Sequence, residues 1–212
     1  MHFGSSSPGS ERTATTLDTP RRPQNWSPIV ISGPSGVGKG TLRQKLRERH
    51  PGLFATTVSH TTRAPRPGEK HGRDYHFVSW DEFRALVESG AFLEHMEYNG
   101  NLYGTSKATA TLHHEGQVLL LDIDVEGAKS LKREAAITPR YVFIRPHDLT
   151  VLEQRLRGRN TETDEAIQQR LARARVEMAF AASTESGFDK IIVNHNLEEA
   201  VTELESFIFE RS

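Results

Sequence analysis

Short apolar runs alternate with stretches of helical periodicity along most of the chain. The runs at 28–32 (PIVIS), 118–123 (VLLLDI), 140–145 (RYVFIR) and 190–194 (KIIVN) predict buried strands. Helices are predicted at 39–50, 125–134, 149–157, 163–182 and 197–210. This alternation is typical of an α/β fold, in which helices cover a central parallel sheet.

The long interval between the first helix and the second strand needs a fold of its own. Residues 51–117 are too many for a structureless loop in a compact domain. Within them, 75–78 and 92–98 are predicted strands. Ser79 and Glu82 form a capping box that opens a helix, which Gly90 ends. We therefore predict a small inserted lobe at about 59–108.

The first 27 residues differ in composition from the rest. They are rich in Ser, Thr, Pro, Gly and Arg and hold few aliphatic side chains, which predicts a disordered tail before a domain at 28–212. A transit peptide is the alternative, because the segment carries several arginines. Glu11, Asp18 and the lack of an amphipathic repeat favour the tail.

Composition and charge narrow the class of protein. The chain has 212 residues, 27 Lys+Arg against 28 Asp+Glu, and no Cys. One domain is expected, and thiolate metal sites, disulfides and cysteine catalysis are excluded. A nucleic-acid partner is not expected without a basic excess, and no apolar run approaches the ~20 residues that span a bilayer. We expect a cytoplasmic monomer.

The histidines do not suggest a resident metal site. The chain has ten of them, and none shows a convincing metal-ligand spacing. His113 and His114 are adjacent on a predicted helix, so their side chains diverge.

The segment GPSGVGKGT at 33–41 has the sequence of a P-loop. It follows the first strand and opens a helix, where backbone N–H groups and the helix dipole attract phosphates. Lys39 supplies a mobile charge for the β- and γ-phosphates. ATP contacts are expected from Gly33, Ser35, Gly36, Val37, Gly38, Lys39, Gly40 and Thr41.

The expected Mg²⁺ position departs from the usual pattern. Gly40 stands where Ser or Thr is typical, so we expect Mg²⁺ to arrive with ATP and to be held by water and ATP oxygens, helped by Thr41 or Asp122. Asp122 and Asp124 both follow the buried strand and point the same way in extended chain. Asp124 has an alternative role as a helix cap. The DxxG spacing of Asp124 and Gly127 matches GTPases, but a guanine motif near Asn194 is missing.

The segment at 58–69 combines two arginines with prolines. Pro65 and Pro67 stiffen the loop, and Arg63 and Arg66 offer guanidinium forks that each bind two oxygens. Such a loop fits a phosphate clamp, to which Tyr75 and Tyr103 add hydroxyl donors. A solvated basic loop is the alternative.

The sequence resembles the guanylate kinase family from about residue 28 to 209. The resemblance is carried by 29–41, 59–69, 72–77 (GRDYHF), Tyr103-Gly104, 121–124 (LDID) and 157–163 (RGRNTET). It implies a P-loop NTPase three-layer sandwich with a central parallel sheet, an inserted NMP-binding lobe and a short lid at about 155–170. It also implies transfer of the terminal phosphoryl group of ATP to GMP, with dGMP as a second acceptor, in purine metabolism.

The resemblance assigns roles residue by residue. GMP contacts are expected from Ser59, Arg63, Arg66, Tyr75, Glu94, Tyr103, Thr105, Asp122 and Asp124. A carboxylate at 94 accepts both N1–H and N2–H₂ of guanine, whereas adenine has no N1–H and leaves that carboxylate unpaired. A solvated glutamate is the alternative for Glu94. Asn194 is expected near the adenine of ATP.

The densest group of arginines lies at 155–175. The family places Arg159 and Arg170 on the phosphates, so with Lys39 and Arg63 they are the expected catalytic residues. Arg157, Arg173 and Arg175 are interpreted as solvated side chains paired with nearby Glu.

Two rival functions remain. A guanylate-kinase-like binding module keeps the fold but loses the phosphate loop, which Lys39 and its glycines argue against. Another nucleotide kinase would act on AMP, UMP or dTMP, and Glu94 with the 59–69 segment argues against that.

Overall fold

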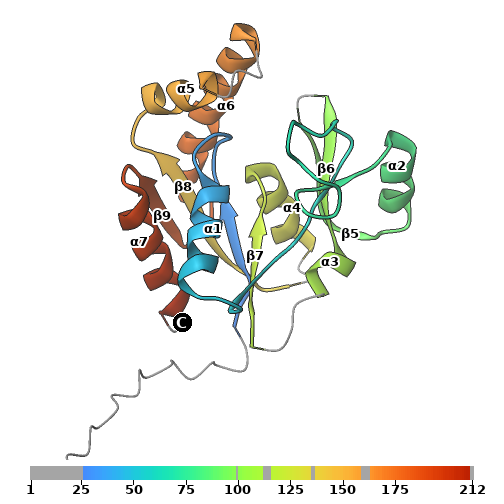
Figure 1. The fold of residues 1–212 in the computed structure, drawn as a ribbon, viewed down its shortest axis with the longest axis horizontal. Helices are drawn as coiled ribbons and strands as arrows, with labels where there is room; N and C mark the ends of the chain where they lie inside the picture. Colours follow the sequence, from blue (N-terminus) through green and yellow to red (C-terminus); the bar gives the residue numbers. More distant parts are fainter. Residues whose placement is uncertain (1–25, 99, 112–115, 135–136, 159–162, 211–212) are drawn as a thin grey trace, which may run out of the picture.

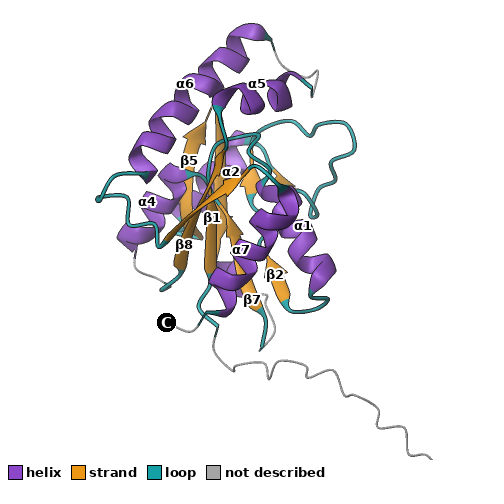
Figure 2. Ribbon diagram, turned by 90° about the vertical axis from the view of Figure 1, so that its left-hand side faces the viewer, coloured by secondary structure: helices purple, strands orange, loops and turns teal. Residues whose placement is uncertain are grey.

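In the computed structural model, a parallel sheet with helices on both faces forms the body of the protein (Figures 1 and 2). The structure describes residues 26–98, 100–111, 116–134, 137–158 and 163–210. Within them the sheet has five strands in the order β2-β7-β1-β8-β9. Their bounds are β1 Ile29–Ser32, β2 Phe54–Thr56, β7 Val118–Asp122, β8 Arg140–Pro146 and β9 Lys190–Asn194.

Helices pack on both faces because the strands are apolar on both. Their bounds are α1 Lys39–Arg49, α4 Val125–Glu134, α5 Leu149–Arg157, α6 Asp164–Ala181 and α7 Leu197–Phe209. In β1, Ile29 and Ile31 pack with α1 and α7, whereas Val30 packs with α4. All of β1 is buried, as a central parallel strand must be. The predicted three-layer α/β sandwich is confirmed.

A second sheet forms the lobe to the right of the first in Figure 1. Its strand order is β4-β3-β6-β5. The elements are β3 His60–Thr61, β4 His76–Phe77, β5 Phe92–Tyr98 and β6 Asn101–Ser106, with α2 Trp80–Glu88 and α3 Lys107–Thr111. Phe83 of α2 stacks on Phe92 of β5 with ring centres 4.6 Å apart. Leu93 on the same strand joins the core on the α4 side of the large sheet, so the lobe is anchored to the body.

The predicted elements differ from the structure mainly where strands are short or polar. β2, β3, β6 and α3 were not predicted, because β2, β3 and α3 are only three, two and five residues long and the sequence NLYGTS of β6 is polar, so all carry little apolar signal. The other boundaries differ by at most a few residues. His113 and His114 lie outside the described residues, as do Arg159 and most of the segment between α5 and α6.

The packed part of the chain reaches back to Trp26. Its ring lies 5.6 Å from that of Phe209, and it packs against the core beside α7. Trp26 therefore belongs with the domain, two residues before the predicted boundary at 28. No helix in the described residues is long and apolar enough to cross a membrane.

The capping box of α2 gives a test of how the lobe is held. The Ser79 hydroxyl accepts from the Glu82 N–H at 3.2 Å, and the Glu82 carboxylate accepts from the Ser79 N–H at 2.7 Å. Ser79→Ala should lower the free energy of unfolding by about 1 kcal/mol in urea denaturation. Ser89→Ala, at the exposed C-terminal end of the same helix, is the control and should change it by less than about 0.5 kcal/mol. Equal effects would contradict this role of the cap.

Candidate active site

A cavity of about 180 Å³ lies between the lobe and the carboxyl ends of the large sheet. Residues predicted to contact ATP and residues predicted to contact GMP both line it. It is lined by Gly33, Ser35, Lys39, Ser59, Arg63, Arg66, Tyr75, Glu94, Met96, Tyr98, Tyr103, Gly104, Asp122, Ile123, Asp124, Arg170 and Glu177. Thr105 is not among them, but its hydroxyl lies 3.2 Å from that of Ser59, which is. Gly36, Val37, Gly38, Gly40, Thr41 and Asn194 lie outside the lining.

Close packing fixes the course of the P-loop. At Gly33, φ is 142°, and a Cβ there would lie 2.1 Å from the carbonyl oxygen of Ile144. At Gly38, φ is 102°, and a Cβ would lie 2.7 Å from Nδ2 of Asn194. Only glycine fits both positions, so the loop can pack closely against β8 and β9.

Lys39 and Asp122 lie on the phosphate side of the cavity. Nζ of Lys39 donates to the carbonyl oxygen of Gly33 at 2.6 Å and lies 4.0 Å from the Asp122 carboxylate. Arg43, one turn along α1, pairs with the other oxygen of Asp122 at 3.2 Å. The P-loop lysine therefore sits beside a carboxylate that is already balanced by a second cation.

Helices α5 and α6 and strand β9 contact the P-loop from the other side. Arg170 of α6 donates to the Ser35 hydroxyl at 2.6 Å. Arg155 of α5 and Asn194 of β9 both donate to the carbonyl oxygen of Val37, at 3.1 and 2.7 Å. Arg170 thus reaches the P-loop. Asn194 is buried and supports the loop, while its contact with adenine stays a prediction.

A carboxylate organises the predicted phosphate clamp. Glu69 accepts from the guanidinium of Arg63 at 3.0 Å and from the backbone N–H of Arg66 at 2.7 Å. The Arg63 guanidinium also lies 5.5 Å from the ring centre of Tyr75. Burial raises the pKa of Tyr75 to about 12, so its hydroxyl stays a hydrogen-bond donor at neutral pH. The loop presents two arginines and a tyrosine to the cavity.

Glu94 is a buried carboxyl at the opposite side of the cavity. A bulge in β5 between Phe92 and Glu94 turns its side chain, which is 5% exposed. Burial raises its pKa to about 7, although hydrogen bonds from Thr105 act to lower it. The hydroxyls of Ser59 and Thr105 lie 3.2 Å apart beside it. This wall therefore offers an acceptor and two hydroxyls to a base edge.

Asp124 caps a helix, as the sequence allowed, and it also lines the cavity. One oxygen accepts from the Gly127 N–H at 2.8 Å, which caps α4, and the other accepts from Arg173 at 2.8 Å. Burial raises the pKa of Asp124, and the Gly127 N–H and the Arg173 guanidinium act against that rise. A Cβ on Gly127 would lie 2.8 Å from the Glu94 carboxylate, so this glycine lets the two carboxyls share the cavity.

Several residues of the site were missed or misread in the sequence. Arg173 was interpreted as a solvated side chain paired with a nearby Glu; it does pair with Glu177, and it also pairs with Asp124. Glu177 was not singled out, yet it is buried and lines the cavity. Its spacing of four residues from Arg173 on a helix was the available signal. The solvated interpretation of Arg157 agrees with its exposed pairs to Glu153 and Asp164.

The residues around Asp122 fit a magnesium ion that arrives with a nucleotide. The described residues contain no group of three or more His, Asp or Glu side chains that would hold a metal by themselves. Mg²⁺ at phosphate sites uses one or two carboxylates and takes its other ligands from phosphates and water. A single carboxylate beside Lys39 matches that donor set.

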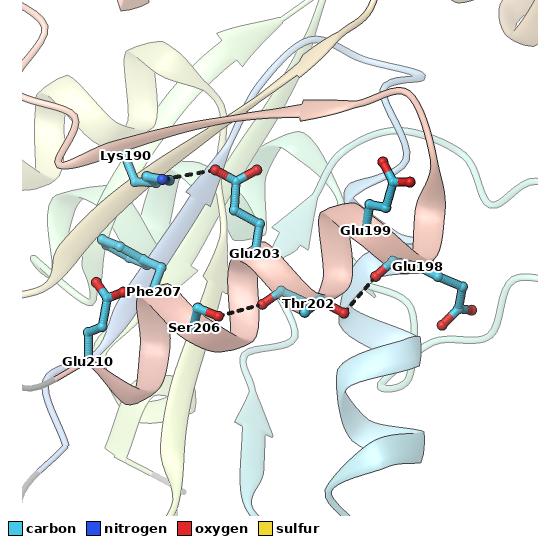
Figure 3. A pocket seen from close by; sticks show the side chains of 8 residues that line it. All are labelled: Lys190, Glu198, Glu199, Thr202, Glu203, Ser206, Phe207 and Glu210. Carbon is cyan, nitrogen blue, oxygen red and sulfur yellow. Dashed lines mark hydrogen bonds and ion pairs between the residues drawn. The ribbon is translucent and has the colours of Figure 1, made fainter.

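A second hollow follows α7 and β9 (Figure 3). It is lined by Lys190, Glu198, Glu199, Thr202, Glu203, Ser206, Phe207 and Glu210. Lys190 pairs with Glu203 at 2.9 Å, which leaves the hollow with acidic side chains. Such a surface repels phosphates, whereas the first cavity is lined by Lys39, Arg63, Arg66 and Arg170 and so suits them better.

Comparisons with known proteins agree on one family. The guanylate kinase family model matches residues 25–211. The guanylate kinase of Sus scrofa is 46% identical over 185 residues, covering 86% of this chain and 92% of that protein. The guanylate kinase of Thermosynechococcus vestitus is also 46% identical, covering 90% and 97%. A crystal structure of guanylate kinase from Anaplasma phagocytophilum matches with a TM-score of 0.67 and 30% identity, covering 86% of this chain and 84% of that one.

The raised pKa of Glu94 predicts a cost in stability at neutral and alkaline pH. Between the ordinary glutamate pKa and about 7, the folded protein holds a proton that the unfolded chain releases, so the free energy of unfolding falls as pH rises. We compare the free energy of unfolding of Glu94→Gln with that of the unaltered protein at two pH values. The difference in favour of Glu94→Gln should increase by on the order of 2 kcal/mol from about pH 5 to about pH 8. Urea denaturation at both pH values measures this.

The control for that measurement is Glu97→Gln, at an exposed position of the same strand. It should shift stability equally at both pH values. A Glu94→Gln variant that behaved in the same way would show that burial does not perturb Glu94.

Proposed function

The chain belongs to the guanylate kinase family, and we propose that it transfers the terminal phosphoryl group of ATP to GMP, giving ADP and GDP, with dGMP as a second acceptor. The observation that supports this best is the pairing of two features in one cavity, the P-loop with Lys39 and the buried carboxyl of Glu94. The first suits a nucleoside triphosphate, and the second suits a guanine edge.

The base wall gives the proposed acceptor specificity. In its ionised form, Glu94 accepts from N1–H and N2–H₂ of guanine, and Ser59, Thr105 and Asp124 surround the same edge. Adenine offers no N1–H, so it would leave a buried carboxyl unsatisfied. A site built on such hydrogen bonds rejects the wrong base strongly.

The cations at the other side of the cavity suit two sets of phosphates. Arg63, Arg66, Tyr75 and Tyr103 would hold the phosphate of GMP. Lys39 and the loop N–H groups would hold the phosphates of ATP, and Arg170, beside Ser35, would reach the group in transfer. Phosphoryl transfer depends mainly on alignment and on balancing charge on the phosphoryl oxygens, so these residues suffice without a general base.

We assign the remaining roles on the same basis. Mg²⁺ bound with ATP would be held by Asp122, with Thr41 as a second candidate, and would balance charge between the two nucleotides. The segment at about 155–170, with Arg159, would act as a lid that keeps water from the phosphoryl group. Because one chain supplies every assigned residue, we propose a monomer. We also propose that it acts in the cytoplasm in purine metabolism.

Substrate preference tests the proposed function. With ATP as donor, the purified protein should phosphorylate GMP at least about a thousandfold more efficiently than AMP, UMP or dTMP in a coupled assay of ADP formation. Lys39→Ala should lower kcat by more than about a hundredfold, because it removes the charge on the transferring phosphates. Lys45→Ala, further along α1 and paired with exposed Glu48 and Glu198, is the matched control.

Each alternative result has a distinct meaning. Equal rates with AMP would contradict the assignment of Glu94 to guanine. No turnover with any nucleotide, together with tight binding of GMP, would favour a binding module over an enzyme.

Metal dependence tests the role of Asp122. EDTA should abolish turnover but leave GMP binding intact, because the acceptor contacts do not use the metal. Asp122→Asn should raise the Mg²⁺ concentration for half-maximal rate by about tenfold or more, while Asp74→Asn in the lobe should not. An unchanged Mg²⁺ requirement in Asp122→Asn would assign the metal to other ligands.

A further inference from the structure

Arg173 connects three parts of the molecule that surround the cavity. It lies on α6, which follows the lid segment. Its Nη2 donates to Asp124 at the start of α4 at 2.8 Å, and its Nε donates to Glu177 on its own helix at 2.8 Å. Its guanidinium centre lies 4.3 Å from the ring centre of Tyr98, at the end of β5 in the lobe. A single side chain therefore touches the body, the lid helix and the lobe.

The two carboxylates that Arg173 contacts need a cation. The side chains of Asp124 and Glu177 are 24% and 10% exposed, so both have lost much of their water. A guanidinium fork satisfies two such groups at once with fixed geometry, and a lysine ammonium does this less well because it has no planar fork. The arginine at this position thus fixes the direction of both carboxylates.

Arg173 acts from behind the cavity wall. Asp124, Glu177 and Tyr98 line the cavity, but Arg173 does not. Each oxygen of a carboxylate accepts up to two hydrogen bonds. Asp124, already held by Gly127 and Arg173, therefore keeps acceptor capacity for a base in the cavity.

We propose that Arg173 is a positioning residue for GMP, which orients the Asp124 carboxylate toward the guanine and ties it to Tyr98 of the lobe. The inference rests on the proposed function and adds a residue that the sequence did not indicate. It concerns the acceptor side alone, since the contacts of Arg173 are with residues of the guanine wall and its neighbours. Its hydrogen bonds and its ring contact are with Asp124, Glu177 and Tyr98 and not with the P-loop itself, although the Tyr98 ring also lies 5.9 Å from the guanidinium of Arg170.

Arg173→Gln should raise KM for GMP by about tenfold, the loss of roughly one charge-assisted hydrogen bond at a partly exposed site. KM for ATP and kcat should stay within about threefold, because the donor side is untouched. Arg173→Lys keeps the charge without the planar fork, so its KM for GMP should lie between that of the unaltered protein and that of Arg173→Gln. Isothermal titration of GMP in the absence of ATP should show the same order, which loss of folding alone would not produce.

The matched control is Arg175→Gln, which removes the same charge from an exposed position of the same helix. The inference is overturned if Arg173→Gln raises KM for GMP no more than Arg175→Gln does. It is also overturned if Arg173→Gln raises KM for ATP as much as KM for GMP. If Arg173→Gln does not fold, Arg173→Lys decides, since an unchanged KM for GMP would contradict the role of the fork. An unaltered chain without GMP phosphorylation would contradict the proposed function itself, separately from this inference.

Discussion

The burial of Glu94 is the constraint around which the site is built. The residue is 5% exposed, and among the described residues its polar neighbours are Thr105, which donates to it, and the Asp124 carboxyl, with no cation paired to it. An ionised carboxylate in that setting is unfavourable until donors arrive. In the proposed function, guanine would supply two donors on one edge, so the stabilisation that the protein lacks would come from the acceptor. Selectivity follows because a base without those donors leaves the group unsatisfied.

The rest of the cavity separates two kinds of chemistry. Lys39, Arg63, Arg66 and Arg170 lie where phosphates would bind, and Glu94, Asp124 and Glu177 lie where the base would bind. Two carboxylates near the cations are balanced by ion pairs of their own. Arg43 pairs with Asp122, and Arg173 pairs with Asp124. Both parts of the fold contribute to each set, since the lobe carries Glu94 as well as Arg63 and Arg66, and the body carries Lys39 as well as Asp124.

The sequence predicted the features that depend on local pattern. The P-loop, the capping box of Ser79 and the buried strands all have signals within a few residues, and each appears in the structure. What it did not predict depends on contacts between distant segments. The sequence of β6, NLYGTS, is polar, so it does not show an apolar pattern of its own. Strand β6 is defined by its pairing with β5, which only the structure shows. Arg173 was assigned to solvent because its partner Asp124 is 49 residues away. Glu69 lies within the segment that the sequence singled out. Its hydrogen bonds to Arg63 and to the backbone of Arg66 are visible only in the structure.

The protonation state of Glu94 with and without GMP tests the account most directly. Carbon-13 NMR of the Glu94 carboxyl follows the protonation of this one side chain directly. Without nucleotide, the account predicts a pKa of about 7. With saturating GMP, it predicts that the pKa falls well below that value, because the guanine donors favour the ionised form. A titration that GMP leaves unchanged, or a carboxyl that is already ionised at acid pH without it, would contradict the claim that this buried group selects guanine.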